Sequence, residues 1–456
     1  MVILWLISIA SAVELTRCYP TGLSEEAYCG SYAVPEDRST PEGRQLDLHV
    51  LILPSVRANP KVDPLFVLAG GPGQGASQVA ATMMPMLQRI HQQRTIVFLD
   101  QRGTGKSAPL DCEFEDPSSS DVPTKELQQC LQQLDADTTQ YTTDILAQDT
   151  DEVREALGYS QINLYGGSYG TRLGLVYIRN YPDRVRSAVL DGIAPPQQPI
   201  GGDFGQYAQR ALEAVFSDCL AVTECANAFP LLEKRFYMVL DTLHEEKKVH
   251  LPHPITHDVE LFDINKDLFL STLQQLLYDP TTASLIPYII TAAYDENWSP
   301  LIALGHQDSF GQVSIGLYLS IVCAEDVPRI NYNDPTEYTM GSHLTLELQE
   351  MCSVWPSASI EDQFFIAIQS DVPILLLSGA HDPVTPPENG SLALETLTNA
   401  IHIEVPGMAH NTLRSECMLK IFQDFVETRD TQELELSCVS EHHRPPFVLS
   451  PSGTAP

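Results

Sequence analysis

A serine between glycines is the residue in this sequence best suited to covalent chemistry. Residues 164–171 read Leu-Tyr-Gly-Gly-Ser-Tyr-Gly-Thr, a Gly-x-Ser-x-Gly pattern centred on Ser168. Such a serine sits on a sharp turn between a strand and a helix, and Gly166 and Gly170 let the two elements approach closely. The turn presents the hydroxyl to a substrate carbonyl, and the next amide, that of Tyr169, faces the oxyanion that forms. The pattern predicts acyl transfer through Ser168.

A serine nucleophile needs a base, and the base needs a group that orients it. Asp382 follows the apolar run 373–377, and His410 follows the alternating run 401–405. Loops at the carboxyl ends of parallel strands share one edge of a sheet, so these side chains can meet Ser168 there. We expect His410 to accept the serine proton and return it to the leaving group, while Asp382 holds the histidine tautomer.

Each of these two residues also has a plainer interpretation. Asp382 precedes Pro383 and alternatively caps a turn, and His410 taken alone is alternatively an ordinary loop histidine. His381 is a rival base, but it adjoins Asp382 in the same tight loop. The chain order Ser168, Asp382, His410 is the order of the triad in α/β-hydrolases, and this favours the catalytic interpretation.

Two glycine-containing loops flank the predicted site. The loop Gly70-Gly71-Pro72-Gly73 follows the apolar run 64–69, and we expect the Gly71 amide to be the second oxyanion donor; the alternative is a plain turn. Residues 100–107, Asp-Gln-Arg-Gly-Thr-Gly-Lys-Ser, resemble a phosphate-binding loop, but Asp100 stands where that loop needs glycine. We predict a structural loop beside the site, with Arg102 bound to Asp100 or to a neighbouring loop.

The elements that must position these loops indicate an α/β fold. Short apolar runs suit strands buried on both faces of a sheet, and helix-like segments separate them. The runs are 64–69, 95–99, 162–165, 187–190, 373–377 and 401–405, with a half-exposed strand at 46–52. This alternation predicts a mostly parallel, doubly wound sheet.

The pattern changes in the middle of the chain. Helical segments replace core strands there, at 206–220, 231–243, 264–277 and 309–322. We predict a largely helical cap at 196–356, inserted into an α/β core formed by residues 13–195 and 357–440. Residues 441–456 are rich in Pro and Ser and are expected to be a loose tail.

Composition narrows the choice of partners. The chain has 456 residues, 43% of them hydrophobic, enough for a large packed core with a second domain. The formal net charge is −34, which argues against nucleic acid and anionic membranes as partners. Most of this charge is expected to be a solvated surface.

The amino terminus and the cysteines point to export. The apolar run 2–10 and the small residues Ala10-Ser11-Ala12 predict a signal peptide at 1–12, although no basic residue precedes Arg17; a buried strand or a truncated gene start are alternatives. Ten cysteines follow, without a Cys-x-x-Cys motif, which favours disulfides over zinc or buried thiols. Close sequential pairing predicts Cys18–Cys29, Cys112–Cys130, Cys219–Cys225, Cys323–Cys352 and Cys417–Cys438. We therefore expect a secreted or periplasmic protein.

Taken together, the motifs at 70–73, 100–107 and 166–170 and the Asp382 and His410 loops resemble the proline iminopeptidase and tripeptidyl aminopeptidase family of α/β-hydrolases. Proline iminopeptidases usually carry His where Ala69 stands. The length, the cysteines and the segment 321–326, Ile-Val-Cys-Ala-Glu-Asp, are more similar to the exported tripeptidyl aminopeptidase branch. The resemblance implies the α/β-hydrolase fold with a cap, and cleavage of short peptides from a free amino terminus. It also implies no metal or organic cofactor; it leaves the residue preference and the oligomeric state open.

An aminopeptidase needs a countercharge for the ammonium group of its substrate. The resemblance places an acid near the end of the cap, and our hypothesis gives this role to Glu325 or else to Asp326; the alternative is a solvated acidic pair beside a disulfide. Other functions remain open at this stage. A carboxylesterase or lipase-like enzyme would use the same triad, and a catalytically silent binding protein would share the fold. Epoxide and haloalkane hydrolases normally carry Asp in place of Ser168.

Overall fold

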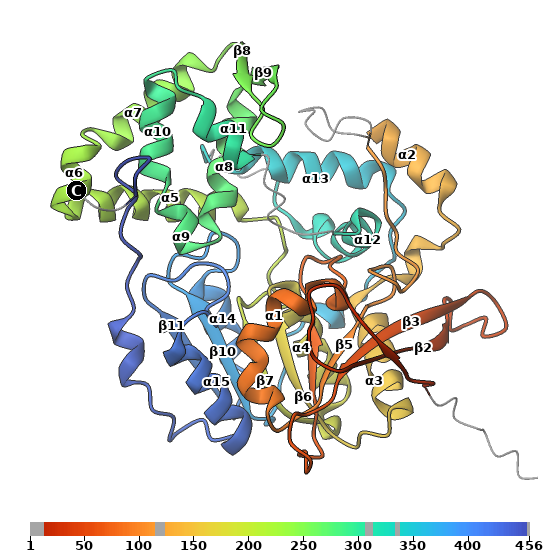
Figure 1. Cartoon of the computed structure of the whole chain (residues 1–456). Helices are drawn as coiled ribbons and strands as arrows, with labels where there is room; N and C mark the ends of the chain where they lie inside the picture. Colours follow the sequence, from red (N-terminus) through yellow and green to blue (C-terminus); the bar gives the residue numbers. More distant parts are fainter. Residues whose placement is uncertain (1–12, 115–123, 306–312, 333–337, 454–456) are drawn as a thin grey trace, which may run out of the picture.

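The computed structural model describes residues 13–114, 124–305, 313–332 and 338–453, and the predicted signal segment 1–12 lies outside this range. A nine-stranded sheet forms the centre of the lower half of the molecule in Figure 1. Its strand order is β1-β2-β3-β5-β4-β6-β7-β10-β11. The pairs from β1 to β5 are antiparallel, and all pairs from β5 to β11 are parallel. The predicted mostly parallel sheet is therefore confirmed.

The strands lie close to the predicted apolar runs. They are β1 (Thr16–Cys18), β2 (Ala27–Pro35), β3 (Gln45–Leu53), β4 (Leu65–Leu68), β5 (Ile96–Leu99), β6 (Ile162–Gly167), β7 (Val185–Asp191), β10 (Ile374–Gly379) and β11 (Ala400–Val405). In β4, Phe66 and Leu68 pack on one face of the sheet, and Leu65 and Val67 pack on the other. Because both faces are covered, the central strands need apolar residues at every position, and this is the pattern in the sequence.

Helices cover both faces of the sheet. One face carries α3 (Thr143–Ala156), α4 (Tyr169–Asn180) and α14 (Pro387–Leu394), and the other carries α1 (Ala76–His91) and α15 (Glu416–Thr428). The first residues of α1 and α4 follow directly after the loops that leave β4 and β6. The carboxyl ends of these strands therefore carry the two loops that the sequence analysis assigned to the oxyanion hole.

A second, mainly helical layer lies above the sheet in the view of Figure 1. Its elements are α5 (Phe204–Ala221), α6 (Thr223–Ala228), α7 (Leu232–Thr242), α8 (Lys266–Leu277), α9 (Pro280–Ala283), α10 (Ile286–Tyr294), α11 (Ser299–Gly305), α12 (Ile315–Glu325) and α13 (Ser342–Val354). The hairpin of β8 (Lys247–Pro252) and β9 (Val259–Ile264) belongs to this layer as well. Helices α5, α7, α8, α10 and α11 share an apolar core of their own, separate from the cores on the sheet.

Two segments differ from the sequence-based expectation. Helix α2 (Thr124–Gln133) comes from the first part of the chain, but it packs on α12 and α13 through Leu127. The end of the chain is not loose up to residue 453. Phe447 is buried in the core of the cap, the Val448 amide donates to Ser284, and Arg444 pairs with Asp218 of α5. The Pro-rich composition of this tail predicted a loose segment, but a few of its side chains pack against the cap.

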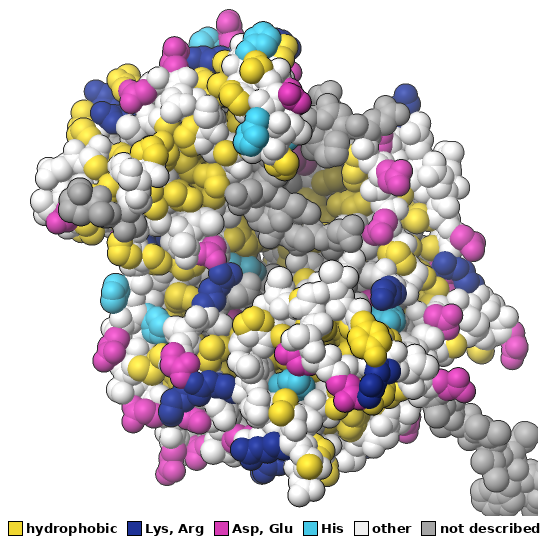
Figure 2. Space-filling view, in the orientation of Figure 1, with side chains coloured by type: hydrophobic (Ala, Val, Ile, Leu, Met, Phe, Trp, Pro, Cys, Tyr) yellow, Lys and Arg dark blue, Asp and Glu magenta, His cyan; other side chains and the backbone are white. Residues whose placement is uncertain are grey.

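The ten cysteines form five disulfides, and the pairing is the predicted one: Cys18–Cys29, Cys112–Cys130, Cys219–Cys225, Cys323–Cys352 and Cys417–Cys438. Disulfides at this density are typical of proteins that fold in an oxidising compartment. Among the described residues, no helix has both the length and the apolar character needed to cross a bilayer. Figure 2 shows basic side chains interspersed among the acidic ones over this face of the molecule.

Candidate active site

Ser168 occupies the turn between β6 and α4 with a backbone conformation that side chains rarely adopt. Its φ is 55° and its ψ is −126°. A Cβ added at Gly166 would overlap the Gly170 carbonyl group, and one added at Gly170 would overlap the carbonyl oxygen of Leu68. The two glycines therefore permit the close approach of strand and helix that holds the serine in its strained turn. The turn has the geometry expected of a nucleophile elbow, and the role of Ser168 as nucleophile stays a prediction.

The imidazole of His410 and the carboxylate of Asp382 form a buried pair. Nδ1 of His410 lies 2.8 Å from Oδ2 of Asp382, although the two residues follow different strands, β11 and β10. The other oxygen of Asp382 accepts the amides of Val384 and Thr385, at 2.9 and 2.8 Å. Asp382 therefore both caps its turn and orients His410, so the two interpretations of this residue hold together.

Thr385 adds a second contact to this pair. Its hydroxyl lies 2.8 Å from Oδ2 of Asp382 and 3.1 Å from Nδ1 of His410. Burial raises the pKa of Asp382, but His410 and the hydrogen bonds outweigh it, so the pKa lies below its usual range. Burial lowers the pKa of His410, while the charge and hydrogen bond of Asp382 raise it, and the net pKa lies above its usual value. The pair thus stabilises the imidazolium that would form during proton transfer.

The rival base, His381, lies apart from this pair. Its Nε2 atom is 3.9 Å from Asp218 of α5, and burial lowers its pKa. Its side chain therefore faces the cap helix α5, while the neighbouring Asp382 side chain faces His410.

Asp191, at the end of β7, joins the loops of Ser168 and His410. Its backbone carbonyl accepts the Ser168 amide at 2.9 Å. Its side chain accepts the amide of Thr412 at 3.0 and 2.8 Å, and that of Leu413 at 3.3 Å. Burial raises the pKa of Asp191 to about 6, against the opposing effect of these amides and of His410. Sequence analysis missed this residue; the available signal was an apolar strand that ends in Asp-Gly.

Glycines next to Ser168 and Asp191 allow the three loops to touch. A Cβ at Gly192 would lie 3.0 Å from Oγ1 of Thr385 and 3.1 Å from Cε1 of His410. A Cβ at Gly167 would lie 3.2 Å from the side-chain oxygen of Asn411, the residue after His410. The elbow and the histidine loop therefore lie against each other, with β7 between β6 and β10 as their common support.

The glycine loop after β4 lies against the nucleophile. A Cβ at Gly70 would be 3.2 Å from Cβ of Ser168. Gly71 and Gly73 have φ values of 103° and 111°, which other residues rarely adopt. The position and backbone conformation of this loop are thus those expected if the Gly71 amide is the second oxyanion donor.

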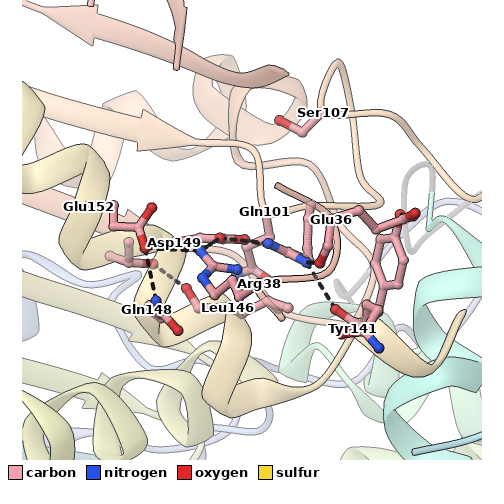
Figure 3. Close-up of polar contacts among 12 residues, drawn as sticks. Glu36, Arg38, Gln101, Ser107, Tyr141, Leu146, Gln148, Asp149 and Glu152 are labelled. Carbon is pink, nitrogen blue, oxygen red and sulfur yellow. Dashed lines mark hydrogen bonds and ion pairs between the residues drawn. The ribbon is translucent and has the colours of Figure 1, made fainter. Parts of the chain in front are cut away.

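The loop at 100–107 has a structural role. Asp100 accepts the amide and the hydroxyl of Ser77, at 2.7 and 2.8 Å, and so caps the first turn of α1. Arg102 is fully buried and pairs with Asp149 of α3 at 2.6 and 2.8 Å, rather than with Asp100. Figure 3 shows the surroundings of this pair, where Arg38 also reaches Asp149. The loop therefore ties α1 and α3 to the sheet beside the site.

Glu325 and Asp326 lie at the end of α12, with no exposed surface. The carboxylate of Glu325 accepts the amide and the hydroxyl of Thr143, at 2.7 and 2.8 Å. Asp326 accepts Nη1 of Arg172 at 2.8 Å, and the same nitrogen lies 3.5 Å from Glu325. A substrate ammonium group would have to displace Thr143 or Arg172 to reach Glu325. These contacts favour a different role for Glu325 than the one suggested by the sequence.

The cap touches the histidine loop directly. The His410 amide donates to the carbonyl of Tyr278 at 3.0 Å, and the two rings meet edge to face with centroids 5.3 Å apart. The next cap residue, Asp279, forms an ion pair with Arg414. The segment after α8 thus forms part of the wall around the imidazole.

Comparison with known proteins shows which families this chain is similar to. A family model described as alpha/beta hydrolase fold matches residues 63–232, and one described as TAP-like protein matches residues 337–438. The serine protease Hip1 of Mycobacterium tuberculosis is 24% identical over 426 residues, which cover 83% of this chain and 81% of Hip1.

Two further relatives match shorter stretches. The tripeptidyl aminopeptidase of Streptomyces lividans is 30% identical over 198 residues, 39% of this chain and 37% of that protein. The proline iminopeptidase of Neisseria gonorrhoeae is 35% identical over 136 residues, 30% of this chain and 34% of that protein. The chain is therefore an α/β-hydrolase, and it is similar to serine peptidases that include tripeptidyl aminopeptidases and proline iminopeptidases.

Proposed function

We propose that this protein is a serine aminopeptidase that removes one or more residues from the free amino terminus of short peptides. Ser168 is the nucleophile, His410 the general base and acid, and Asp382 the residue that orients and stabilises the imidazole. The backbone amides of Gly71 and Tyr169 form the oxyanion hole. The reaction passes through an acyl-enzyme on Ser168.

The steps follow from the chemistry of the triad. His410 takes the proton from Ser168 as Oγ attacks the scissile carbonyl carbon, and the two amides stabilise the oxyanion. The C–N bond then breaks, and His410 gives its proton to the leaving amine. A water molecule, deprotonated by His410, next attacks the ester carbonyl; the proton returns to Ser168 when the acid product leaves.

One observation carries this proposal. His410 and Asp382 form a buried pair 2.8 Å apart, and Asp191 hydrogen-bonds both the loop of His410 and the strained turn of Ser168. Such a pair is costly to bury unless both partners are hydrogen-bonded, and here both are. The arrangement has the chain order and the strand positions of an α/β-hydrolase triad.

The preference for a free amino terminus is supported by the relatives and not by a residue of the site. Two of them are named tripeptidyl aminopeptidase and proline iminopeptidase. The five disulfides support an exported protein, secreted or periplasmic. Short exogenous or envelope peptides are the substrates consistent with that compartment.

A small panel of substrates tests the proposal. The panel pairs free and N-acetylated aminoacyl, dipeptidyl and tripeptidyl amides, and adds a short-chain nitrophenyl ester. We expect the free peptides to have the higher kcat/KM, and mass spectrometry of the products to give the number of residues released. A preference for the ester, or indifference to acetylation, would point to an esterase. No turnover and no labelling of Ser168 by a fluorophosphonate would point to a binding protein.

A further inference from the structure

Helix α12 of the cap touches the two loops that carry the proposed oxyanion donors. At its start, the Ser314 amide donates to the carbonyl of Gly73 at 2.9 Å, and a Cβ at Gly73 would lie 2.8 Å from the carbonyl oxygen of Ser314. At its end, Glu325 and Asp326 face α4, which begins at Tyr169. A single helix therefore contacts the glycine loop with one end and the elbow helix with the other.

A chain of hydrogen bonds runs from Glu325 to the ring of Tyr169. The Thr143 hydroxyl donates to Oε2 of Glu325 at 2.8 Å, and the Tyr169 hydroxyl lies 2.8 Å from the same Thr143 oxygen. Because the Thr143 proton is directed at the carboxylate, Tyr169 donates the second bond. All three side chains are buried, with Tyr169 at 1% exposure and the other two at 0%.

Two features hold the carboxylate in place. Glu325 also accepts the backbone amide of Thr143, the first residue of α3, where the helix dipole favours a negative group. Arg172, one turn after Tyr169 in α4, lies 3.5 Å from Glu325 and 2.8 Å from Asp326. The first turn of α4 is thus anchored twice to the end of α12, through the Tyr169 hydroxyl and through Arg172.

We propose that Glu325 is a positioning residue that orients the oxyanion-hole amide of Tyr169 through the Thr143 hydroxyl. The inference rests on the proposed function, because it assigns the Tyr169 amide to the oxyanion. The side chain and the amide of Tyr169 belong to one residue, so a ring fixed at its far end limits rotation of the peptide plane at the elbow. A donor held in this way aids the transition state more than the ground state.

The test breaks the chain at its middle and at its end. Thr143→Val and Tyr169→Phe each remove one hydroxyl and leave the ion pairs of Arg172 intact. Matched controls come from the same helices: Thr150→Val, whose hydroxyl bonds to Leu146 in α3, and Tyr177→Phe, whose hydroxyl bonds to Asp151. We measure kcat and KM on the best free-amino peptide amide, and affinity for a peptidyl boronic acid, which forms a tetrahedral adduct.

We expect Thr143→Val and Tyr169→Phe each to lower kcat by about 10- to 100-fold, and to change KM less than about twofold. This loss of kcat is smaller than the loss expected when a whole oxyanion donor is removed. Boronate affinity should fall by a similar factor. The kcat of the double variant should be no lower than that of the less active single variant, since both substitutions break the same chain of hydrogen bonds. Thr143→Ser should restore most of the activity, and both controls should retain it.

The inference would be overturned if the variants had the same kcat as their controls, or if the substitutions raised KM and left kcat unchanged. Either result would leave the proposed function in place. Loss of thermal stability without loss of boronate affinity would reduce Thr143 to a structural residue and overturn it too. If the wild-type protein neither turns over peptides nor binds the boronate, the proposed function fails, and the inference fails with it.

Discussion

The carboxylate of Asp191 accepts the backbone amide of Thr412 at 3.0 and 2.8 Å, two residues after His410. The carbonyl of the same Asp191 accepts the Ser168 amide at 2.9 Å. One residue thus holds the turn of the proposed nucleophile through its main chain and the loop of the proposed base through its side chain. Its strand, β7, lies between the strands that precede Ser168 and Asp382.

Replacing Asp191 should therefore disorganise the site without touching the substrate. We expect Asp191→Ala to lower kcat by about 10- to 100-fold, because small displacements of a catalytic group are costly. Asp63→Asn is a control, since Asp63 is a paired aspartate, bound to Arg94 and Arg186, that precedes β4 and so lies at the opposite ends of the strands from the site. Steady-state kinetics at saturating peptide measures the effect. Equal kcat values for wild type and Asp191→Ala would rule out this bridging role.

The pH profile of kcat/KM should follow the protonation of His410. Burial lowers the pKa of His410, but Asp382 and, more weakly, Asp191 raise it above 6.5. Only the neutral imidazole accepts the serine proton, so kcat/KM should rise as the pH rises through the pKa of His410. Asp191→Asn removes a nearby negative charge, so the midpoint of the acidic limb should move to lower pH. A midpoint that stays in place or moves upward would show that another group governs the limb.

Asp191 should also give stability a pH dependence of a particular sign. Burial raises the pKa of Asp191 from 3.8 to about 6, so between these values the folded protein binds the proton more tightly than the unfolded chain. The contribution to stability is present below pH 3.8 and is lost as the pH rises through 6. Relative to Asp191→Asn, wild type should lose up to about 3 kcal/mol between pH 4 and 7. Urea unfolding of both proteins across this range gives the difference, and a difference that grows with pH in favour of wild type would contradict it.

The core strands β4, β5, β6, β7 and β10 could be predicted from the sequence because buried parallel strands need apolar residues at every position. The turn at Ser168 and the loops of Asp382 and His410 could be predicted as well, since glycines, a strand-ending Asp and a loop His carry their signal locally; their catalytic roles stay predictions. The role of Asp191 could not, because it depends on β7 lying between β6 and β10, and strand order is not written in any short segment.

The tertiary contacts of the predicted helical cap escaped prediction for the same reason. The hypothesis that Glu325 binds the substrate ammonium group came from the family resemblance, which places an acid near the end of the cap. Its actual partners, Thr143 and Arg172, are about 150 to 180 residues away in the sequence. The packing of α2 on α13 and of Phe447 in the cap likewise depends on tertiary contacts that no periodicity reveals.

The disulfides should differ in their contribution to stability according to the loops that they close. Cys323–Cys352 joins α12 to α13 across 29 residues, whereas Cys219–Cys225 spans 6. Loss of chain entropy in the unfolded state predicts about 4 kcal/mol for the longer loop and about 2 kcal/mol for the shorter one. Unfolding of the two double Cys→Ser variants under non-reducing conditions measures this. A larger loss of unfolding free energy on removal of Cys219–Cys225 than of Cys323–Cys352 would show that native packing, and not loop length, sets the order.

The most direct test of the central claim is the turnover of a free-amino peptide amide by Ser168→Ala. Ser187→Ala is the matched control, because Ser187 is buried in β7 and bonds to Asn163. We predict that Ser168→Ala lowers kcat by about 10³-fold or more while the protein stays folded, and that Ser187→Ala keeps turnover close to wild type. Peptide hydrolysis by Ser168→Ala at the wild-type rate would contradict the account.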